Sequence, residues 1–89
     1  MPSEIVRGTV TAPYWDWDGR KYVEISGRRI KVPFRYGRVM CHMTGLKTIQ
    51  EFKKGDLIQA YVEKKFWDGD EFWVLISAGE LEQPPQHTE

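Results

Sequence analysis

The chain is poor in cysteine and histidine. Cys41 is the only cysteine among 89 residues, so no internal disulfide can form. A structural zinc site needs about four Cys or His ligands at characteristic spacing. Here Cys41 and His42 are neighbours, and only the distant His87 could join them. We therefore expect neither a metal ion nor another cofactor.

The chain also lacks long hydrophobic runs. No charged segment followed by an extended apolar stretch opens it, which argues against a secretory signal and against membrane insertion. We expect an intracellular, cytoplasmic protein that does not enter membranes. Its length suits one domain, which we place at residues 1–82. The polar segment 83–89 contains two prolines and is predicted to be a disordered tail.

Groups arranged for catalysis are missing as well. His42 and His87 belong to no defensible Ser/His/Asp or Cys/His arrangement, and the chain has no glycine-rich phosphate loop. Asp68, Asp70 and Glu71 are close in sequence, but such a cluster is typical of a solvated turn. We expect no enzymatic activity.

Aromatic side chains and segregated charge are what the chain has in quantity. It contains four tryptophans, and its formal net charge is zero. Residues 1–54 nevertheless hold eleven Lys and Arg against five Asp and Glu, whereas residues 55–89 hold two against eight. Most of the positive excess lies at residues 20–38. Such a run is typical of a solvated strand face, or alternatively of a surface that binds a polyanion.

Alternating apolar and polar residues predict five strands. They cover residues 5–12, 22–26, 29–36, 57–67 and 72–78. Gly8 indicates a close approach or a bend in the first strand, and Gly27 with Arg28 is expected to form the turn before the third. The alternation within the third strand places Ile30, Val32, Phe34 and Tyr36 on one face and Arg29, Lys31 and Arg35 on the other.

A different period follows Cys41. Leu46, Ile49 and Phe52 are three residues apart, which predicts one short helix. Thr48 and Glu51 have the spacing of a capping box, and Gly55 is placed to end the helix. The residues expected to be mostly buried are Val6, Val10, Val23, Ile25, Ile30, Val32, Leu57, Val62, Val74 and Ile76.

The tripeptide Trp-Asp-Gly occurs twice, at residues 17–19 and 67–69. We predict a four-residue loop in each copy, so that Trp17 pairs with Tyr22 and Trp67 with Phe72 across the strands. Such pairs stabilise a hairpin by about 0.2 to 1 kcal/mol. This role leaves other aromatic residues of the two turns unexplained, so a binding role stands beside it.

The order of the predicted elements, Gly8 in the first strand and the segment KKGDLIQAYVE (residues 53–63) resemble the OB-fold superfamily over about residues 5–81. The resemblance implies an all-β, five-stranded Greek-key barrel with a short helix between its third and fourth strands. An SH3-like barrel is the alternative, because it too uses five short strands. The helix-like segment favours the OB-fold.

OB-folds bind oligonucleotides or oligosaccharides on the face of strands two and three, between two loops. In this chain those loops correspond to residues 14–21 and 66–71. Resemblance to the members that bind single-stranded nucleic acid implies single-stranded DNA or RNA as the partner, held by aromatic stacking and by cations on the phosphates. The residues expected to bind it are Tyr14, Trp15, Trp17, Arg20, Lys21, Tyr22, Arg29, Lys31, Arg35, Phe66 and Trp67.

Two other functions stay open. Asp16, Asp18, Asp68, Asp70 and Glu71 place carboxylates on the same loops, where they oppose a phosphodiester. The alternative is therefore a module for protein interaction or oligomerisation, since Trp, Tyr and Arg are enriched at interface hot spots. A third possibility is a sugar platform, in which the basic face has no purpose unless the sugar is anionic.

Overall fold

The computed structural model describes residues 2–81, and the predicted tail at 83–89, with His87, lies outside them. Five strands form a barrel. They are β1 (Ser3–Trp17), β2 (Arg20–Ile25), β3 (Arg28–Val32), β7 (Leu57–Trp67) and β8 (Asp70–Glu80). The connection from β3 to β7 carries β4 (Phe34–Arg35), β5 (Arg38–Val39), β6 (His42–Met43) and the 3₁₀ helix η1 (Ile49–Glu51).

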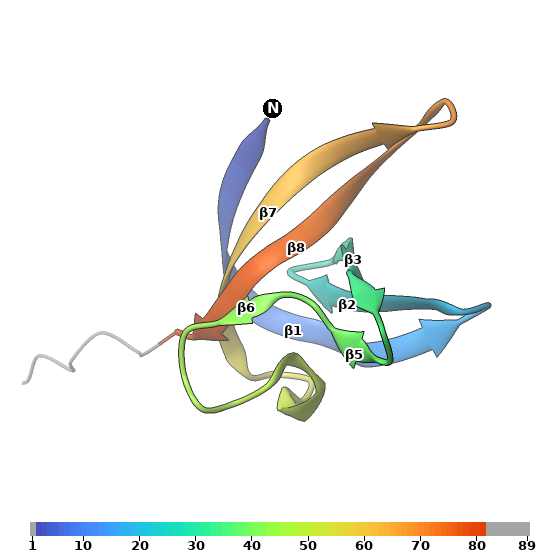
Figure 1. The fold of residues 1–89 in the computed structure, drawn as a ribbon. Helices are drawn as coiled ribbons and strands as arrows, with labels where there is room; N and C mark the ends of the chain where they lie inside the picture. The colour runs from blue at the N-terminus through green and yellow to red at the C-terminus, as the bar shows by residue number, and fades with distance from the viewer. Residues whose placement is uncertain (1, 82–89) are drawn as a thin grey trace, which may run out of the picture.

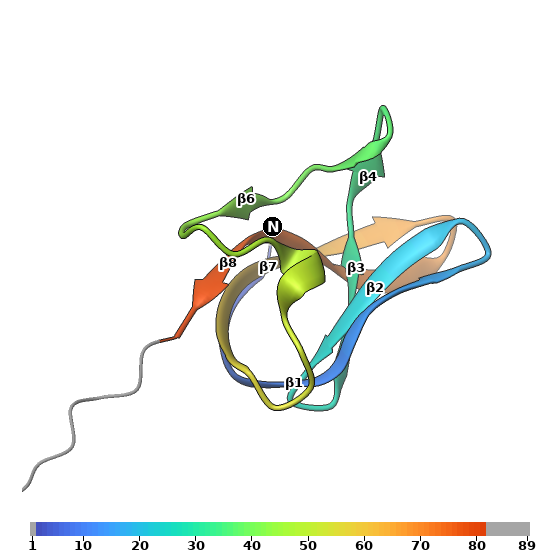
Figure 2. The ribbon, with the colours of Figure 1, turned by 90° about the horizontal axis from the view of Figure 1, so that it is seen from below.

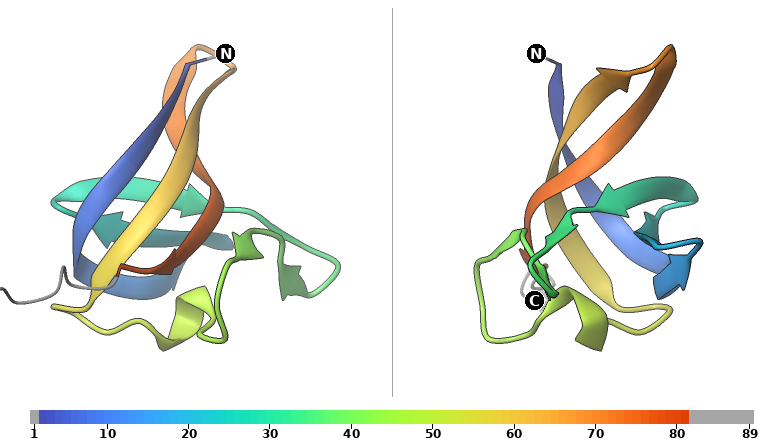
Figure 3. Two further views of the ribbon diagram at one scale, coloured as in Figure 1. Left: turned by 90° about the vertical axis from the view of Figure 1, so that its left-hand side faces the viewer. Right: turned by 45° about the vertical axis from the view of Figure 1, so that its right-hand side comes forward.

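The barrel closes through a single parallel contact. Its strands follow the order β3-β2-β1-β7-β8, and each neighbouring pair in that order is antiparallel. Lys31 of β3 then pairs in parallel with Val74 of β8 and completes the circle. Figures 1 and 3 show β2, β3 and the C-terminal half of β1 running across β7 and β8, while the N-terminal half of β1 follows β7. The predicted all-β, five-stranded barrel is confirmed, and it is consistent with both the OB-fold-like and the SH3-like arrangement.

The core fills the barrel interior. Its buried residues are Val6, Val10, Val23, Ile25, Ile30, Val32, Ile49, Phe52, Ile58, Ala60, Val62, Leu75 and Ala78. The predicted core is thus confirmed in β1, β2 and β3 and at Val62. Close approach at Gly8 is also confirmed, because a Cβ there would collide with the side chain of Ser26 in the β2–β3 turn.

The predicted core residues of β7 and β8 were partly wrong. Leu57, Val74 and Ile76 are only half-buried. A bulge explains the errors in β8. Tyr61 pairs with Ser77 and Val62 pairs with Leu75, which leaves Ile76 without a partner in β7. The alternation therefore shifts, and Leu75 and Ala78 point inward.

The third strand is shorter than predicted. β3 ends at Val32, and Pro33, which has no N–H to donate, precedes a separate β4–β5 hairpin (Figure 2). Phe34 and Tyr36 are consequently exposed, Tyr36 by 87%, instead of sharing the inner face. The preceding turn also differs by one residue, because Ile25 pairs with Arg28 and leaves Ser26 and Gly27 as the turn.

The predicted helix is a single 3₁₀ turn. Thr48 N–H donates to Glu51 Oε1 at 3.0 Å, as a capping box requires. Ile49 and Phe52 are both buried, in keeping with a 3₁₀ helix, in which residues three apart share a face. Leu46, which the prediction placed on the same face, is fully exposed. No helix within residues 2–81 has the length and apolar character needed to cross a membrane.

Candidate nucleic-acid interface

Both Trp-Asp-Gly turns are tighter than predicted. Trp17 pairs with Arg20, and Trp67 pairs with Asp70, so each loop has two residues instead of four. Asp and Gly have positive φ in both turns, 56° and 77° in the first and 53° and 84° in the second. These values are those of a type I′ turn, which closes an Asp-Gly hairpin in two residues. The predicted pairs of Trp17 with Tyr22 and of Trp67 with Phe72 therefore do not form.

The tight turn gives Tyr22 a different partner. Trp15 lies opposite Tyr22, and their ring centroids are 5.3 Å apart with the planes tilted by 32°. Tyr22 is only 9% exposed. Trp15, which was expected to lie outside the hairpin pairing, is therefore the residue that forms the aromatic pair.

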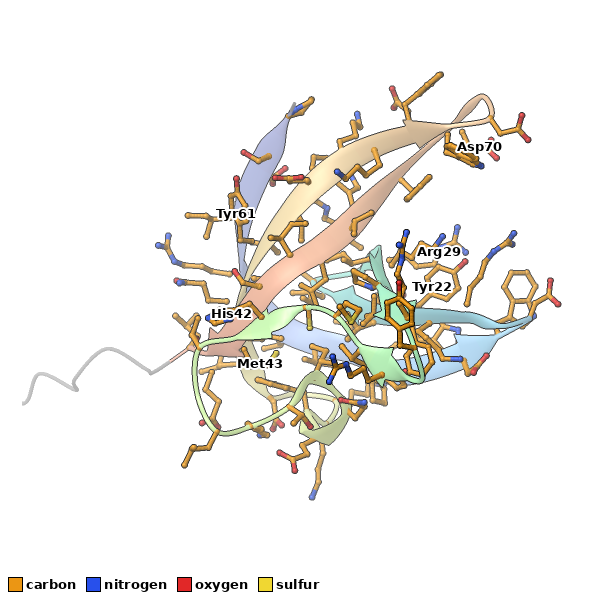
Figure 4. The ribbon with its side chains drawn as sticks, in the orientation of Figure 1. Tyr22, Arg29, His42, Met43, Tyr61 and Asp70 are labelled. Carbon is orange, nitrogen blue, oxygen red and sulfur yellow. The ribbon has the colours of Figure 1, made fainter. Side chains whose placement is uncertain are left out.

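Two hairpins extend from the barrel and enclose a groove. We call them the β1–β2 arm (residues 14–22) and the β7–β8 arm (residues 65–73). Figure 4 shows Tyr22 and Arg29 between the arms and Asp70 at the tip of the β7–β8 arm. The inter-arm groove has a volume of about 1040 Å³. Its lining comprises Trp17, Arg20, Tyr22, Arg29, Lys31 and Arg35 on one side and Lys65, Phe66, Trp67, Asp68, Asp70, Glu71, Phe72 and Trp73 on the other.

Most of the predicted site residues meet in this groove, but Tyr14, Trp15 and Lys21 do not line it. Tyr14 packs against the core, and burial raises the pKa of its phenol. Lys21 forms an ion pair with Asp16, and its ammonium lies 4.5 Å from the centre of the Phe34 ring. The charge of Lys21 is therefore already compensated.

One wall of the groove is basic. We use the name basic wall for Arg20, Arg29, Lys31 and Arg35. Within residues 2–81, none of these cations has an ion-pair partner. The guanidinium of Arg29 lies 5.1 Å from the centre of the Tyr22 ring, and the ammonium of Lys31 lies 4.9 Å from that of Phe72. Aromatic faces hold these cations without neutralising them.

The opposite wall combines exposed rings with carboxylates. Phe66 and Trp67 are 68% and 74% exposed, and Trp17 across the groove is 60% exposed. Glu71 forms an ion pair with Lys64 at 3.2 Å. Asp70 has no ion-pair partner among the residues that the structure describes.

Lys65, Phe72 and Trp73 line the groove but were not among the predicted site residues. The two-residue Asp-Gly turn was the missing signal. It places Lys65 opposite Phe72, and this pair lies two positions along the strands from the pair of Trp67 and Asp70 at the tip. Trp73 lies under two cations: Arg28 is 4.8 Å and Lys64 5.4 Å from the ring centre. Arg28 also donates to Glu4 Oε2 at 2.8 Å, and this hydrogen bond lowers the pKa of Glu4.

The sulfur and imidazole groups lie elsewhere. Figure 4 shows His42 and Met43 on β6, away from the arms. Cys41 is half-buried, and burial raises the pKa of its thiol. Residues 2–81 contain no group of three or more His, Cys, Asp or Glu side chains placed to hold a metal ion.

Comparison with known proteins identifies no relative of this chain. No family model, no curated protein and no solved structure matches the chain.

Proposed function

We propose that this protein is a non-catalytic, intracellular module that binds single-stranded DNA or RNA in the inter-arm groove. The observation that carries the proposal is the composition of that groove. Exposed rings of both arms face a space that is also lined by the uncompensated cations of the basic wall. Single-stranded nucleic acid needs both, because every base offers a π-face and every phosphate a charge.

Base stacking and phosphate contacts in the groove together predict a modest affinity. Stacking contributes about 1 to 3 kcal/mol per base. Trp17, Phe66 and Trp67 are each more than half exposed, so their faces are open to a ligand. Phosphate contacts to the basic wall add a favourable term that weakens as salt rises, because bound counterions are released on binding.

The proposal is tested by following tryptophan fluorescence during titration with single-stranded DNA, single-stranded RNA and duplex DNA at low and high salt. We expect quenching by single strands with a roughly micromolar midpoint at low salt, and a steep loss of affinity as salt rises. A Trp17→Phe, Trp67→Phe variant should still bind by fluorescence anisotropy but lose most of the quenching, since phenylalanine stacks without emitting in that range.

The protein-interaction alternative gives a different result. Interface aromatics would produce self-association or capture of a protein partner, with no response to oligonucleotides. Unchanged fluorescence at low salt, from a protein whose circular dichroism shows a folded β-barrel, would contradict nucleic-acid binding.

A further inference from the structure

The tip of the β7–β8 arm places a carboxylate beside each exposed ring. Asp70 lies directly opposite Trp67, and Glu71 lies directly opposite Phe66. Facing residues of an antiparallel pair have Cβ atoms about 5 Å apart, and their side chains lie on the same face of the ribbon. At the tip of the β1–β2 arm the corresponding neighbour of Trp17 is Arg20.

Asp68 and Asp70 of this arm have no ion-pair partner within residues 2–81, and of the two it is Asp70 that pairs with Trp67 across the hairpin. Glu71 is held by Lys64 at 3.2 Å. Asp68 occupies the first turn position with a φ of 53°, where aspartate is favoured for the turn itself. Asp70 is exposed, lines the groove next to Trp67 and has no ion-pair partner within residues 2–81.

A base stacked on Trp67 would have the Asp70 carboxylate beside it, because the two residues face each other on the same side of the hairpin. An ionised carboxylate is an acceptor only, with two oxygens that can each receive a hydrogen bond. Guanine offers two adjacent donors, N1–H and the 2-amino group, which match those oxygens. Cytosine and adenine offer one amino group beside an acceptor nitrogen, and thymine and uracil offer one N–H between two carbonyl oxygens.

We infer that Trp67 and Asp70 form a base-recognition site that selects guanine in a single strand. The inference rests on the proposed nucleic-acid binding and gives it a substrate class, guanine-containing single strands. It also orients the ligand. The carboxylate repels phosphates, so the backbone follows the basic wall, where Arg29 and Arg35 are exposed, and the bases turn toward the β7–β8 arm.

The test compares three labelled single strands of about ten nucleotides by fluorescence anisotropy. One is oligothymidine, one carries a central deoxyguanosine, and one carries deoxyinosine, which keeps N1–H but lacks the 2-amino group. We expect the guanine strand to bind about tenfold more tightly than oligothymidine, since a bidentate contact to a base gives discrimination of this order. The inosine strand should lose most of that preference.

Two matched variants assign the preference to one carboxylate. Asp70→Asn should bind guanine and thymine strands with equal affinity, because an amide offers one acceptor and a donor in place of two acceptors. Asp68→Asn removes the same charge two residues away, and asparagine tolerates the positive φ of the turn, so this variant should keep the preference for guanine.

The outcomes separate the inference from the proposed function. Equal binding of guanine and thymine strands by the unmodified protein would overturn the guanine site while leaving nucleic-acid binding in place. A preference that survives Asp70→Asn would overturn the role of Asp70. If none of the strands binds, nucleic-acid binding itself is wrong, and the guanine site is overturned with it.

Discussion

The two arms have the same type of turn but present opposite charges beside the tryptophan. Both contain Trp-Asp-Gly and both close in two residues. The φ values of the aspartate and of the glycine fall in the same conformational region in the two turns. The residue after the glycine is Arg20 in one arm and Asp70 in the other. The repeated tripeptide thus specifies the backbone of a type I′ hairpin, and the residues flanking it decide which charge is presented beside the tryptophan.

The arms also differ in how their aromatic rings are used. In the β1–β2 arm, Trp15 and Tyr22 pack against each other, and only Trp17 is mainly exposed. In the β7–β8 arm, Phe66 and Trp67 are both mainly exposed. The first arm therefore uses part of its aromatic surface for its own stability, whereas the second presents its tip to the groove.

The largest effect is expected from removing the contrast in charge between the walls. Arg29→Glu combined with Arg35→Glu brings the formal charge of the basic wall from +4 to zero, opposite a wall that is already acidic. Both side chains are exposed and have no ion-pair partner within residues 2–81, so the barrel should still fold, with a small loss of stability from the contact of Arg29 with the Tyr22 ring. Affinity for a single strand should fall about 100-fold at low salt, and its dependence on salt should flatten. Anisotropy titrations at several salt concentrations measure both quantities.

A matched control makes the same change in charge outside the groove. Lys53→Glu combined with Lys54→Glu alters two exposed cations that do not line the groove. This variant should lose much less affinity and keep most of the salt dependence. Equal losses in the two double variants would mean that net charge, and not the groove, determines binding.

The next prediction separates the aromatic residues of the two arms. Trp67→Ala should lower affinity about tenfold, within the range for loss of one stacked base, and change stability little because the ring is exposed. Trp15→Ala should instead lower the free energy of unfolding by about 2 kcal/mol, because it removes the ring that packs on Tyr22. Thermal or urea denaturation and anisotropy titration of both variants provide the measurements.

The conservative variants supply the control for this comparison. Trp67→Phe keeps a face for stacking and should recover most of the affinity, and Trp15→Phe should recover most of the stability. If Trp15→Ala weakened binding without destabilising the protein, Trp15 would be a binding platform and the assignment of roles to the arms would be wrong.

Sequence patterns predicted the barrel but not the detailed geometry of its arms. Alternation placed the core of β1, β2 and β3 correctly, because these strands have one buried face. It failed in β8, where the bulge at Ile76 shifts the period by one residue. It also failed after Pro33, where the chain leaves the barrel and the alternating residues have no sheet to pack on.

The candidate site was predicted in outline. The charges and exposed rings that meet in the groove could be selected from the sequence, because the OB-fold resemblance assigned the two loops to one face. The errors arose from loop length. Counting four loop residues paired Tyr22 with Trp17 instead of Trp15, although Asp-Gly between alternating strands is itself the signal for a two-residue turn.

The smallest effect is expected at Asp56, which directly precedes β7. This residue should influence the stability of the barrel but neither arm. Asp56 accepts a hydrogen bond from the Lys53 backbone N–H at 2.8 Å and one from Lys47 Nζ at 2.9 Å. Its own carbonyl accepts from Val10 N–H, which joins this residue to β1. The Lys53 N–H, and then the Lys47 ammonium, lower the pKa of the Asp56 carboxyl.

A lowered pKa in the folded state fixes the sign of the pH dependence. The contribution of Asp56 to stability is complete above the pKa of the unfolded chain, about 4, and is lost as pH falls through the lower pKa of the folded state. Asp56→Asn should therefore lower the melting temperature modestly at neutral pH and differ progressively less from the unmodified protein as the pH falls below about 4. Scanning calorimetry over this pH range measures the difference. Single-strand affinity of the variant at neutral pH should be unchanged, since Asp56 does not line the groove. A loss of affinity comparable to that of Trp67→Ala would show that the arms depend on the contacts of Asp56.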